Sequence, residues 1–255
     1  MTQPTAAMLV IGDEILSGRT RDANAHLLAQ RMTGLGIRLV EIRVIPDIRA
    51  TIVASVRELS ARVTYLFTSG GIGPTHDDIT ADAVAEAFGA PIGVRDDARA
   101  ILEAYYKPGE LNEARLRMAR IPEGATLIDN PLSHAPGFVI GNCHVMAGVP
   151  SIFAVMLEGL APRLVGGPPI LSHSFRVMLP EGELAEPLGR VAAAHPDISI
   201  GCYPFFRLTA GATIILRGTD PGALARAADE MRAMLAARAP QIEETPPGAA
   251  TEDAR

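Results

Sequence analysis

The chain has 255 residues, of which 48% are hydrophobic and 20% charged, a length and composition that suit one large and one small domain and exclude wholesale disorder. Only 4% of the residues are aromatic and Trp is absent, so we expect an aliphatic core, as in helices packed on a parallel sheet. The formal net charge of −6 argues against a non-specific nucleic-acid binder, because such proteins need a field of cations.

Cysteine usage and hydropathy indicate the compartment. Cys143 and Cys202 match no metal-binding spacing, so neither a zinc site nor a disulfide framework is expected. No basic segment precedes the first apolar run, and no uninterrupted apolar stretch reaches the ~20 residues of a membrane span. The sequence therefore predicts a soluble cytoplasmic protein with no membrane or nucleic-acid partner.

The first 90 residues alternate between buried-strand patterns and amphipathic-helix patterns. Asp47 is expected to cap the second helix, and Gly89 to end the third. This βαβαβα rhythm predicts a three-layer αβα domain, in which a parallel sheet carries helices on both faces. The expected strands are 6–11, 38–45 and 63–68, and the expected helices are 22–33, 48–59 and 80–88.

Residues 96–120 read as helical, with a break at Pro108-Gly109. Their exposed apolar residues suggest self-association into a homo-oligomer. Beyond them, two short apolar runs flank Gly141-Asn142 and predict a β-hairpin over 138–146. Pro150 then opens a helix that is expected to continue to residue 164.

The stretch Gly166-Gly167-Pro168-Pro169 is the strongest linker signal in the chain. It separates a larger domain, 1–167, from a smaller one, 170–240, whose pattern predicts a two-layer α+β unit with the order βαββα. Residues 241–255 are polar and are predicted to be disordered. The expected strands of the smaller domain are 172–178, 199–203 and 212–217, and its expected helices are 183–194 and 222–238.

A glycine-rich loop follows the third strand and predicts a phosphate site. Gly70, Gly71 and Gly73 let the backbone approach a ligand closely, so that several N–H groups converge on an anion beside a helix N-terminus. The loop lacks the Lys-Ser/Thr of a Walker loop and the third glycine of a dinucleotide fingerprint. Pro74 lies in the same turn. Alternatively, the loop is a tight turn whose Asp78 or Thr80 caps the next helix.

Each polar side chain in this loop has two possible roles, one in function and one in local structure. The Ser69 and Thr75 hydroxyls either donate to phosphate or serve as turn formers. His76 is either a general base or a solvated loop residue. Asp77 and Asp78 would repel each other and a phosphate unless a cation lay between them, which favours a Mg²⁺-type divalent metal.

Two more acidic loops end strands of the predicted sheet. Asp13 and Glu14 follow the first strand, and Asp47 follows the second. Because ligands bind at the carboxyl edge of an open α/β sheet, we expect these acids to converge with Asp77 and Asp78. Asp47, Asp77 and Asp78 would hold the metal, and Asp13 or Glu14 would contact a nucleotide or a metal-bound water. Taken singly, each acid is more often a cap or a solvated turn residue.

Five motifs, in chain order, resemble the MoaB/Mog (molybdopterin-binding) domain family. The likeness runs over most of residues 6–165 and is strongest to the N-terminal region of the competence/damage-inducible protein A (CinA) group. Residues 170–240, with Gly201-Cys-Tyr-Pro-Phe205, are similar to the small KH-like domain that follows in that group. The motifs are Gly12-Asp-Glu-Ile-Leu-Ser-Gly18, Asn24, residues 70–80, Ala135-Pro136-Gly137-Phe138 and Gly148-Val149-Pro150-Ser151.

The resemblance implies a site at residues 70–80 and further site residues. Acids at the positions of Asp47 and Asp78 serve metal binding and catalysis in the family, and Asn24, Pro136 and Gly137 join its ligand-binding residues. The family's members form dimers and trimers. Its full-length CinA relatives continue into a nicotinamide-nucleotide amidase domain, an activity not expected of this chain.

The chain departs from the family pattern at its second ligand-facing loop. Ser133-His134 stand where Gly-Thr is usual, Ala147 where Pro is usual, and Ile152 where an acid is usual. These departures bear on the shape of the loop and on the choice of substrate.

Three functions are consistent with these features. The first is metal-dependent hydrolysis of an adenosine-linked pyrophosphate such as ADP-ribose or FAD. The second is molybdopterin binding or adenylyl transfer, with molybdopterin as the ligand of the same loop. The third is a non-catalytic binding protein that retains the pocket without turnover.

Overall fold

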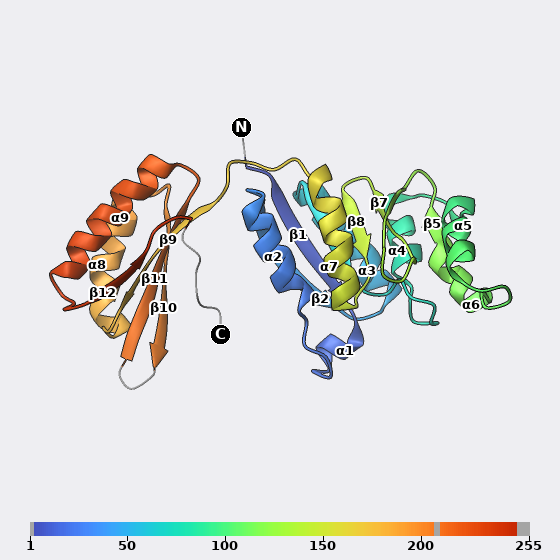
Figure 1. Cartoon of the computed structure of the whole chain (residues 1–255), viewed down its shortest axis with the longest axis horizontal. Coiled ribbons are helices and arrows are strands. Elements are labelled where there is room, and N and C mark those ends of the chain that lie inside the picture. Colours follow the sequence, from blue (N-terminus) through green and yellow to red (C-terminus); the bar gives the residue numbers. More distant parts are fainter. Residues whose placement is uncertain (1–2, 207–209, 249–255) are drawn as a thin grey trace. The chain divides into compact units, whose positions relative to one another are not determined.

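The computed structural model describes residues 3–206 and 210–248 (Figure 1). The chain divides into two compact units, Met1–Gly167 and Pro168–Arg255. The main sheets and the hydrophobic cores of the two units share no residue. Within the described ranges, none of the helices combines the length and apolar character needed to cross a membrane.

The larger unit is built on a six-stranded sheet with the order β2-β1-β3-β8-β7-β6. Neighbours among the first four strands run parallel, whereas β7 is antiparallel to both β8 and β6. The sheet is therefore mostly parallel, and the predicted hairpin at Gly141-Asn142 adds its antiparallel part. The strands are β1 (Thr5–Ile11), β2 (Arg38–Ile45), β3 (Tyr65–Ser69), β6 (Thr126–Ile128), β7 (Gly137–Ile140) and β8 (Cys143–Met146).

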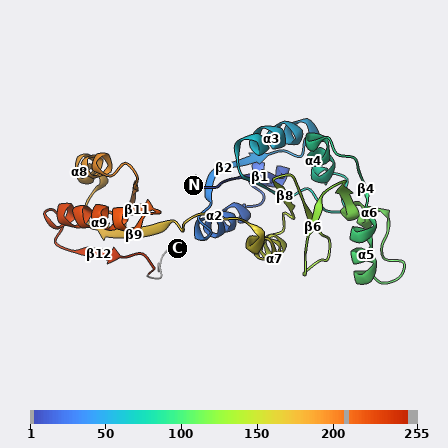
Figure 2. The same cartoon turned by 90° about the horizontal axis from the view of Figure 1, so that it is seen from above.

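Helices cover both faces of this sheet, as Figure 2 shows, which confirms the predicted αβα layers. Alternate residues of β1 belong to the two cores, because successive side chains of a strand point to opposite faces. Ala7 and Leu9 pack toward α3 (Arg49–Arg62) and α4 (Thr80–Phe88). Ala6 and Met8 pack toward α2 (Asn24–Gly34) and α7 (Pro150–Leu160).

Several short elements differ from the sequence prediction. The Asp13-Glu14 loop is the start of a short helix, α1 (Asp13–Leu16). A small sheet pairs β4 with β5, whose three-residue strands are too short to show a periodic pattern. The remaining elements of this unit are α5 (Asp96–Tyr105), α6 (Glu113–Leu116), η1 (Arg117–Ala119), η2 (Ala161–Arg163), β4 (Ile92–Val94) and β5 (Arg120–Pro122).

The prediction that Asp47 caps helix α3 is wrong. The residue at the N-cap of that helix is Ile48, whose apolar side chain cannot accept a hydrogen bond. The Asp47 carboxylate instead accepts a hydrogen bond from the backbone N–H of Asp13, at 3.0 Å. The Asp47 carboxylate thus binds an N–H group of another loop and not the N–H groups at the start of α3.

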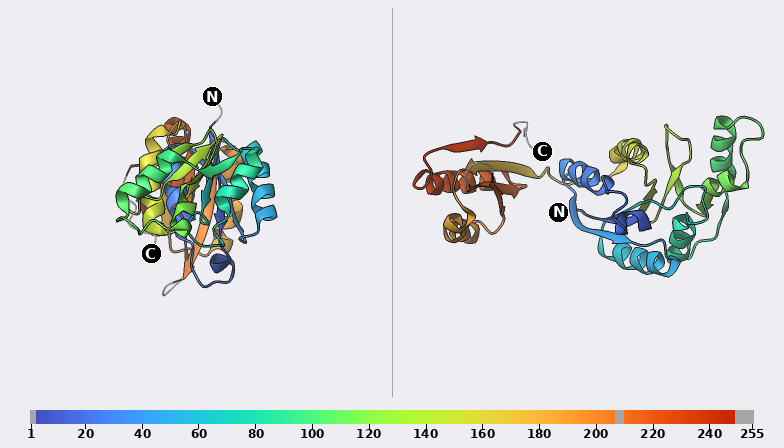
Figure 3. Two further views of the ribbon diagram at one scale, coloured as in Figure 1. Left: turned by 90° about the vertical axis from the view of Figure 1, so that its right-hand side faces the viewer. Right: turned by 90° about the horizontal axis from the view of Figure 1, so that it is seen from below.

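The smaller unit has an antiparallel sheet with the order β10-β11-β9-β12. Its core residues alternate along β9 and β11, so one face of the sheet is buried, and both helices lie on that side (Figure 3). The elements are β9 (Leu171–Val177), α8 (Glu181–Ala194), β10 (Ser199–Phe206), β11 (Ala210–Gly218), α9 (Pro221–Ala236) and β12 (Ile242–Thr245).

Strand β12 corrects the prediction that residues 241–255 are disordered. It pairs antiparallel with β9, placing Glu244 opposite Phe175. Glu244 contacts the His173 ring at 2.7 Å and the Arg232 guanidinium at 2.6 Å. The polar composition that suggested disorder thus supplies ion pairs instead. Residues 249–255 lie outside the described part of the chain.

Candidate functional site

The loops after β1, β2 and β3 meet at the carboxyl edge of the larger sheet. The Asp13 N–H to Asp47 contact joins the first two loops. The pKa of Asp47 is raised, first by burial and then by the negative charges of Asp13, Glu14 and Asp77, which ties the third loop to the same place. Negative charge is therefore concentrated at this edge.

Glycines in the third loop are required by packing inside the protein. Gly70 has φ +105°, and a Cβ there would lie 2.2 Å from the Ile11 carbonyl oxygen. Gly71 has φ +68°, and a Cβ there would lie 2.1 Å from the Thr80 hydroxyl. Only glycine fits both the conformation and the space. The positive φ expected of these glycines is therefore present, and the close approach at both positions is to the protein's own atoms.

The same loop has backbone N–H groups without a hydrogen-bond acceptor in the described part of the chain, beside a cavity of about 490 Å³. Among the hydrogen bonds of the described residues, none is donated by the N–H groups of Gly71, Ile72 and Gly73. All three residues line that cavity. Successive unpaired amides of this kind form an anion-binding concavity.

The Asp78 carboxylate closes the end of this loop. Its Oδ2 accepts hydrogen bonds from the Thr75 N–H at 2.8 Å and from the Thr75 hydroxyl at 2.5 Å. Helix α4 begins at Thr80 without a side-chain cap, so the alternative in which Asp78 or Thr80 caps that helix is wrong. Asp78 also lines the cavity, so its carboxylate both holds the loop and faces the ligand space.

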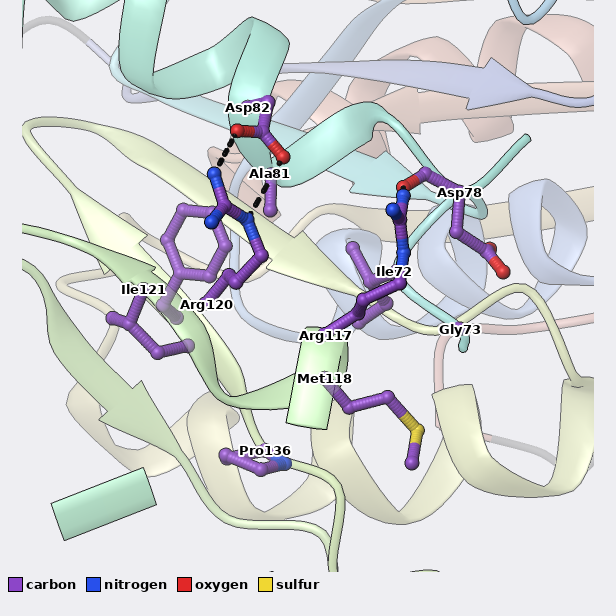
Figure 4. Close-up of a pocket in the computed structure, with 12 residues that line it drawn as sticks. Ile72, Gly73, Asp78, Ala81, Asp82, Arg117, Met118, Arg120, Ile121 and Pro136 are labelled. Atoms are coloured by element: carbon purple, nitrogen blue, oxygen red, sulfur yellow. Dashed lines mark hydrogen bonds and ion pairs between the residues drawn. The ribbon is translucent and has the colours of Figure 1, made fainter. Parts of the chain in front are cut away.

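Some of the predicted site residues line this cavity, and others do not. Among its lining residues are the predicted Glu14, Gly70, Gly71, Gly73, Pro74 and Asp78. Pro136 lines a smaller adjoining pocket that shares residues 71–73 and Asp78 (Figure 4). Neither pocket is lined by Asp13, Asp47, Ser69, Thr75, Asp77, Asn24 or Gly137.

Asn24 and Ser69 support the cavity from behind. Both are buried, and the Asn24 amide donates to the Ser69 hydroxyl and to the Gly148 carbonyl, each at 2.7 Å. Gly137 is also buried, and a Cβ there would lie 2.3 Å from the Val145 carbonyl. In this structure these residues position the walls of the site.

Three of the departures from the family pattern lie in the wall of the same cavity. Ser133, Ala147 and Ile152 line the cavity. The buried Asn130 holds the wall by donating to the Ser133 hydroxyl at 2.6 Å and to the Ala135 carbonyl at 2.8 Å. His134 has φ +60°, and its ring stacks on Tyr105 with 4.5 Å between the ring centres.

The acids at this edge are not assembled into a complete metal site. Within the described residues, no group of three or more His, Cys, Asp or Glu side chains is placed to hold a metal ion. One Asp47 oxygen already accepts the Asp13 N–H. His76 is almost fully exposed, with Nδ1 3.8 Å from Asp77. A divalent ion here would need oxygen ligands from the substrate as well, which is how Mg²⁺ usually binds.

Sequence reasoning missed Arg117, the cation beside the free amides. Its Nη2 donates to the Asp78 carbonyl at 3.2 Å, and its Nε is buried without a hydrogen-bond partner (Figure 4). None of the described carboxylates forms an ion pair with it, whereas the neighbouring Arg120 pairs with Asp82 at 2.5 Å. Nothing local in the sequence distinguishes Arg117, because only the fold brings it to this loop.

Comparisons with known proteins identify the family. Residues 7–166 match the family described as "probable molybdopterin binding domain". The chain belongs to the molybdopterin-binding domain family. This confirms the family and the fold that the motifs predict. Residues 169–243 match a second family, the FAD synthase middle domain.

Relatives place the chain beside CinA-like proteins. It is 37% identical over 246 residues to a CinA-like protein from Citrifermentans bemidjiense, a match that covers 91% of this chain and 58% of that protein. The chain thus spans little more than half of that relative. It is 34% identical over 212 residues to a protein from Pyrobaculum calidifontis, covering 79% of this chain and 81% of the other.

A solved structure supports the same placement. The CinA protein of unknown function from Thermoplasma acidophilum is 30% identical, with a TM-score of 0.60. The match covers 63% of this chain and 98% of that one. The chain is therefore a CinA-like member of the molybdopterin-binding domain family.

Proposed function

We propose that the cavity beside residues 70–78 binds an adenosine-linked pyrophosphate, of the ADP-ribose or FAD type, and hydrolyses it with a divalent metal. The observation that carries the proposal is the row of free amides at Gly71, Ile72 and Gly73, with the Arg117 guanidinium beside it. Converging N–H groups and a guanidinium are the donors that bind phosphate oxygens. The second unit, over residues 169–243, matches the FAD synthase middle domain, which associates the chain, though not this cavity itself, with nucleotide chemistry.

The chemistry proposed is attack of water on one phosphorus of the pyrophosphate. The bond from that phosphorus to the bridging oxygen breaks, giving AMP and ribose 5-phosphate from ADP-ribose, or AMP and FMN from FAD. Asp47, Asp77 and Asp78 are the carboxylates available to hold the metal. A bound divalent metal would supply charge neutralisation of the phosphates and an activated water.

This chain's own residues would do the rest. The amides of residues 71–73 bind and orient the phosphates, and Asp78 fixes the loop that carries them. The buried Asn24 holds the opposite side of the loop through Ser69.

The test is AMP release from ADP-ribose and FAD with Mg²⁺, Mn²⁺, Co²⁺ and Ni²⁺ in turn. We expect metal-dependent AMP release by the wild type and a loss of at least about 100-fold in Asp78→Asn, the size of effect that follows loss of one transition-state electrostatic contact. Asp96→Asn, at the start of α5 and outside both pockets, is the control. Absence of turnover with every metal and both substrates contradicts hydrolysis.

A second candidate is molybdopterin binding or adenylyl transfer at the same cavity. It is favoured by the name of the matched family and by the apolar side chains of Ile72, Val149 and Ile152 in the cavity wall, which suit a flat bicyclic ring. Tight molybdopterin binding without pyrophosphate hydrolysis would favour it. Binding of a nucleotide or pterin without any turnover would instead favour a binding protein, in keeping with the incomplete set of metal ligands.

A further inference from the structure

The outer strand of the larger sheet carries an exposed apolar stripe. Strand β2 is the last in the sheet order, and no strand of the described residues pairs with its outer side. Val40, Ile42 and Val44 are exposed to 43%, 49% and 37%. The register with β1 is regular from Glu41 to Ile45, so alternation places Ile42 and Val44 on one face, whereas Val40 lies at an irregularity between Leu39 and Glu41. An unpaired apolar edge of this kind is a template for pairing with another strand.

The backbone of this strand is oriented to accept a partner. The Ile45 carbonyl accepts the Gly12 N–H at 3.1 Å, so Ile45 directs its backbone groups toward β1. In a parallel pair, successive residues direct these groups to opposite sides. The N–H and C=O groups of Ile42 and Val44 therefore point to the open edge, where a further strand could bind them.

We propose that β2 pairs antiparallel with β2 of a second copy of this chain, around a two-fold axis at Ile42. In this register Ile42 lies opposite the partner's Ile42, within the part of the strand, Glu41 to Ile45, whose register with β1 is regular. Glu41 lies opposite the partner's Arg43, and the symmetry repeats that pair. Apolar residues then meet on one face of the joined sheets, and opposite charges meet on the other.

Charge and backbone geometry select this register over its neighbours. An axis at Glu41 or at Arg43 would place two like charges directly opposite each other, which destabilises a strand pair. An axis at Val44 would place Ile42 opposite the partner's Pro46, which has no N–H to donate. The axis at Ile42 meets both requirements. The outward N–H and C=O groups of Ile42 form its hydrogen-bonded pair, and Glu41 faces the partner's Arg43 in the closer, non-hydrogen-bonded pair.

Glu41 and Arg43 are already at the surface where the partner would reach them. They contact each other at 2.6 Å, and Arg43 also contacts Glu58 of α3 at 2.8 Å. Both side chains remain 26% exposed. Pairing with a second copy would add the partner's opposite charge to this cluster, so that no unpaired charge is buried by the association.

The decisive experiment uses two charge variants of the full chain and sedimentation or light scattering over micromolar concentrations. Glu41→Arg gives a strand with two positive charges, and Arg43→Glu gives one with two negative charges. We expect the wild type to dimerise and each variant alone to dimerise at least about 10-fold more weakly, because like charges then face each other. An equimolar mixture should restore the dimer, since the two strands complement each other in the proposed register.

Two cysteine variants test the position of the axis. Ile42→Cys should form an interchain disulfide, because a hydrogen-bonded antiparallel pair has Cα atoms about 5.5 Å apart, within disulfide range. Ile48→Cys, equally exposed but beyond the strand, should not. A wild-type monomer, or a dimer unaffected by either charge variant, overturns the proposal. The proposal is also overturned if another part of the same chain covers the edge of β2. In that case the Ile42→Cys thiol would neither form a cross-link nor react with a maleimide.

Discussion

Gly70, which follows β3, packs directly against Ile11, the last residue of β1. Its φ of +105° and the 2.2 Å approach to the Ile11 carbonyl leave no room for a side chain. We predict that Gly70→Ala destabilises the larger unit by about 2–5 kcal/mol, the sum of left-handed strain and overpacking. Gly89→Ala is the matched control, because Gly89 has φ +67° but no atom lies within 4 Å of the place a methyl group would take, so about 1 kcal/mol is expected. Urea unfolding gives both values, and equal losses would contradict the role of the contact.

Arg117 is the residue whose charge the site has left unpaired. We predict that Arg117→Ala weakens binding of ADP-ribose by about 10-fold or more, the value of a hydrogen bond from a charged donor to phosphate. Isothermal titration calorimetry measures this. Arg99→Ala is the control, since Arg99 pairs with Glu103 on the surface of α5. Equal affinities of the two variants would remove Arg117 from the site.

Asp47 makes stability depend on pH. Burial and neighbouring carboxylates raise its pKa in the folded state, so its protonation favours folding below the ordinary value of about 3.9, and this contribution is lost as pH rises through the raised pKa. We therefore predict that Asp47→Asn is more stable than the wild type at pH 7, by a margin that shrinks toward pH 4. Unfolding midpoints in urea at the two pH values test it.

Asp77 provides the contrast to that variant. The Thr75 hydroxyl and the backbone N–H of Asp77 lower the pKa of its carboxyl, so its contribution is present above the ordinary pKa and is lost on acidification. Asp77→Asn should therefore lower stability at pH 7. A loss of stability at pH 7 in Asp47→Asn as well as in Asp77→Asn would show that the environment of Asp47 has been misassigned.

Strand β12 shows how a polar segment becomes an element. Arg232, and after it His173, lowers the pKa of Glu244 to about 2. This contribution to stability is complete above about pH 4.5 and is lost as pH falls toward 2. We predict that Glu244→Ala destabilises the smaller unit by about 1 kcal/mol at neutral pH, the usual net value of such hydrogen bonds near a surface. Urea unfolding followed by circular dichroism measures it.

Glu243→Ala is the control on the same strand. The Glu243 side chain is 79% exposed and lies 4.0 Å from Arg176, so its loss should change stability by less than about 0.5 kcal/mol. Equal effects of the two variants would mean that the ion pairs of Glu244 do not hold β12 in place.

Most of the long elements follow from the local sequence. The helix over residues 80–88 and the strand over residues 38–45 occur with the bounds that periodicity predicts. Strands β4 and β5 could not be found this way, because three residues carry no periodic signal and are held only by their pairing. Strand β12 was missed because its four residues carry too short a pattern and depend on His173, 71 residues from Glu244, and on Arg232, which lies in helix α9.

At the scale of the whole molecule, the described residues form three cores, two in the first unit and one in the second, and the proposed ligand cavity belongs to the first unit. The two large cores of the first unit and the core of the second share no residue, and every residue that lines the 490 Å³ cavity lies before Gly167. We predict that a fragment of residues 1–167 folds alone and binds ADP-ribose with the affinity of the full chain. Circular dichroism and calorimetry test this, and a folded fragment with at least 10-fold weaker binding would show that the second unit contributes to the site.

The sequence by itself determined the fold class, the positions of the three acidic loops and the family, because these depend on short-range periodicity and on motifs that are continuous along the chain. Tertiary structure decided which of those residues face the ligand. It turned Asn24 inward to Gly148, 124 residues away, and brought Arg117 to Asp78, 39 residues away. The physical reason is that a side chain's role at the site depends on partners that only packing of the whole unit brings within hydrogen-bond distance.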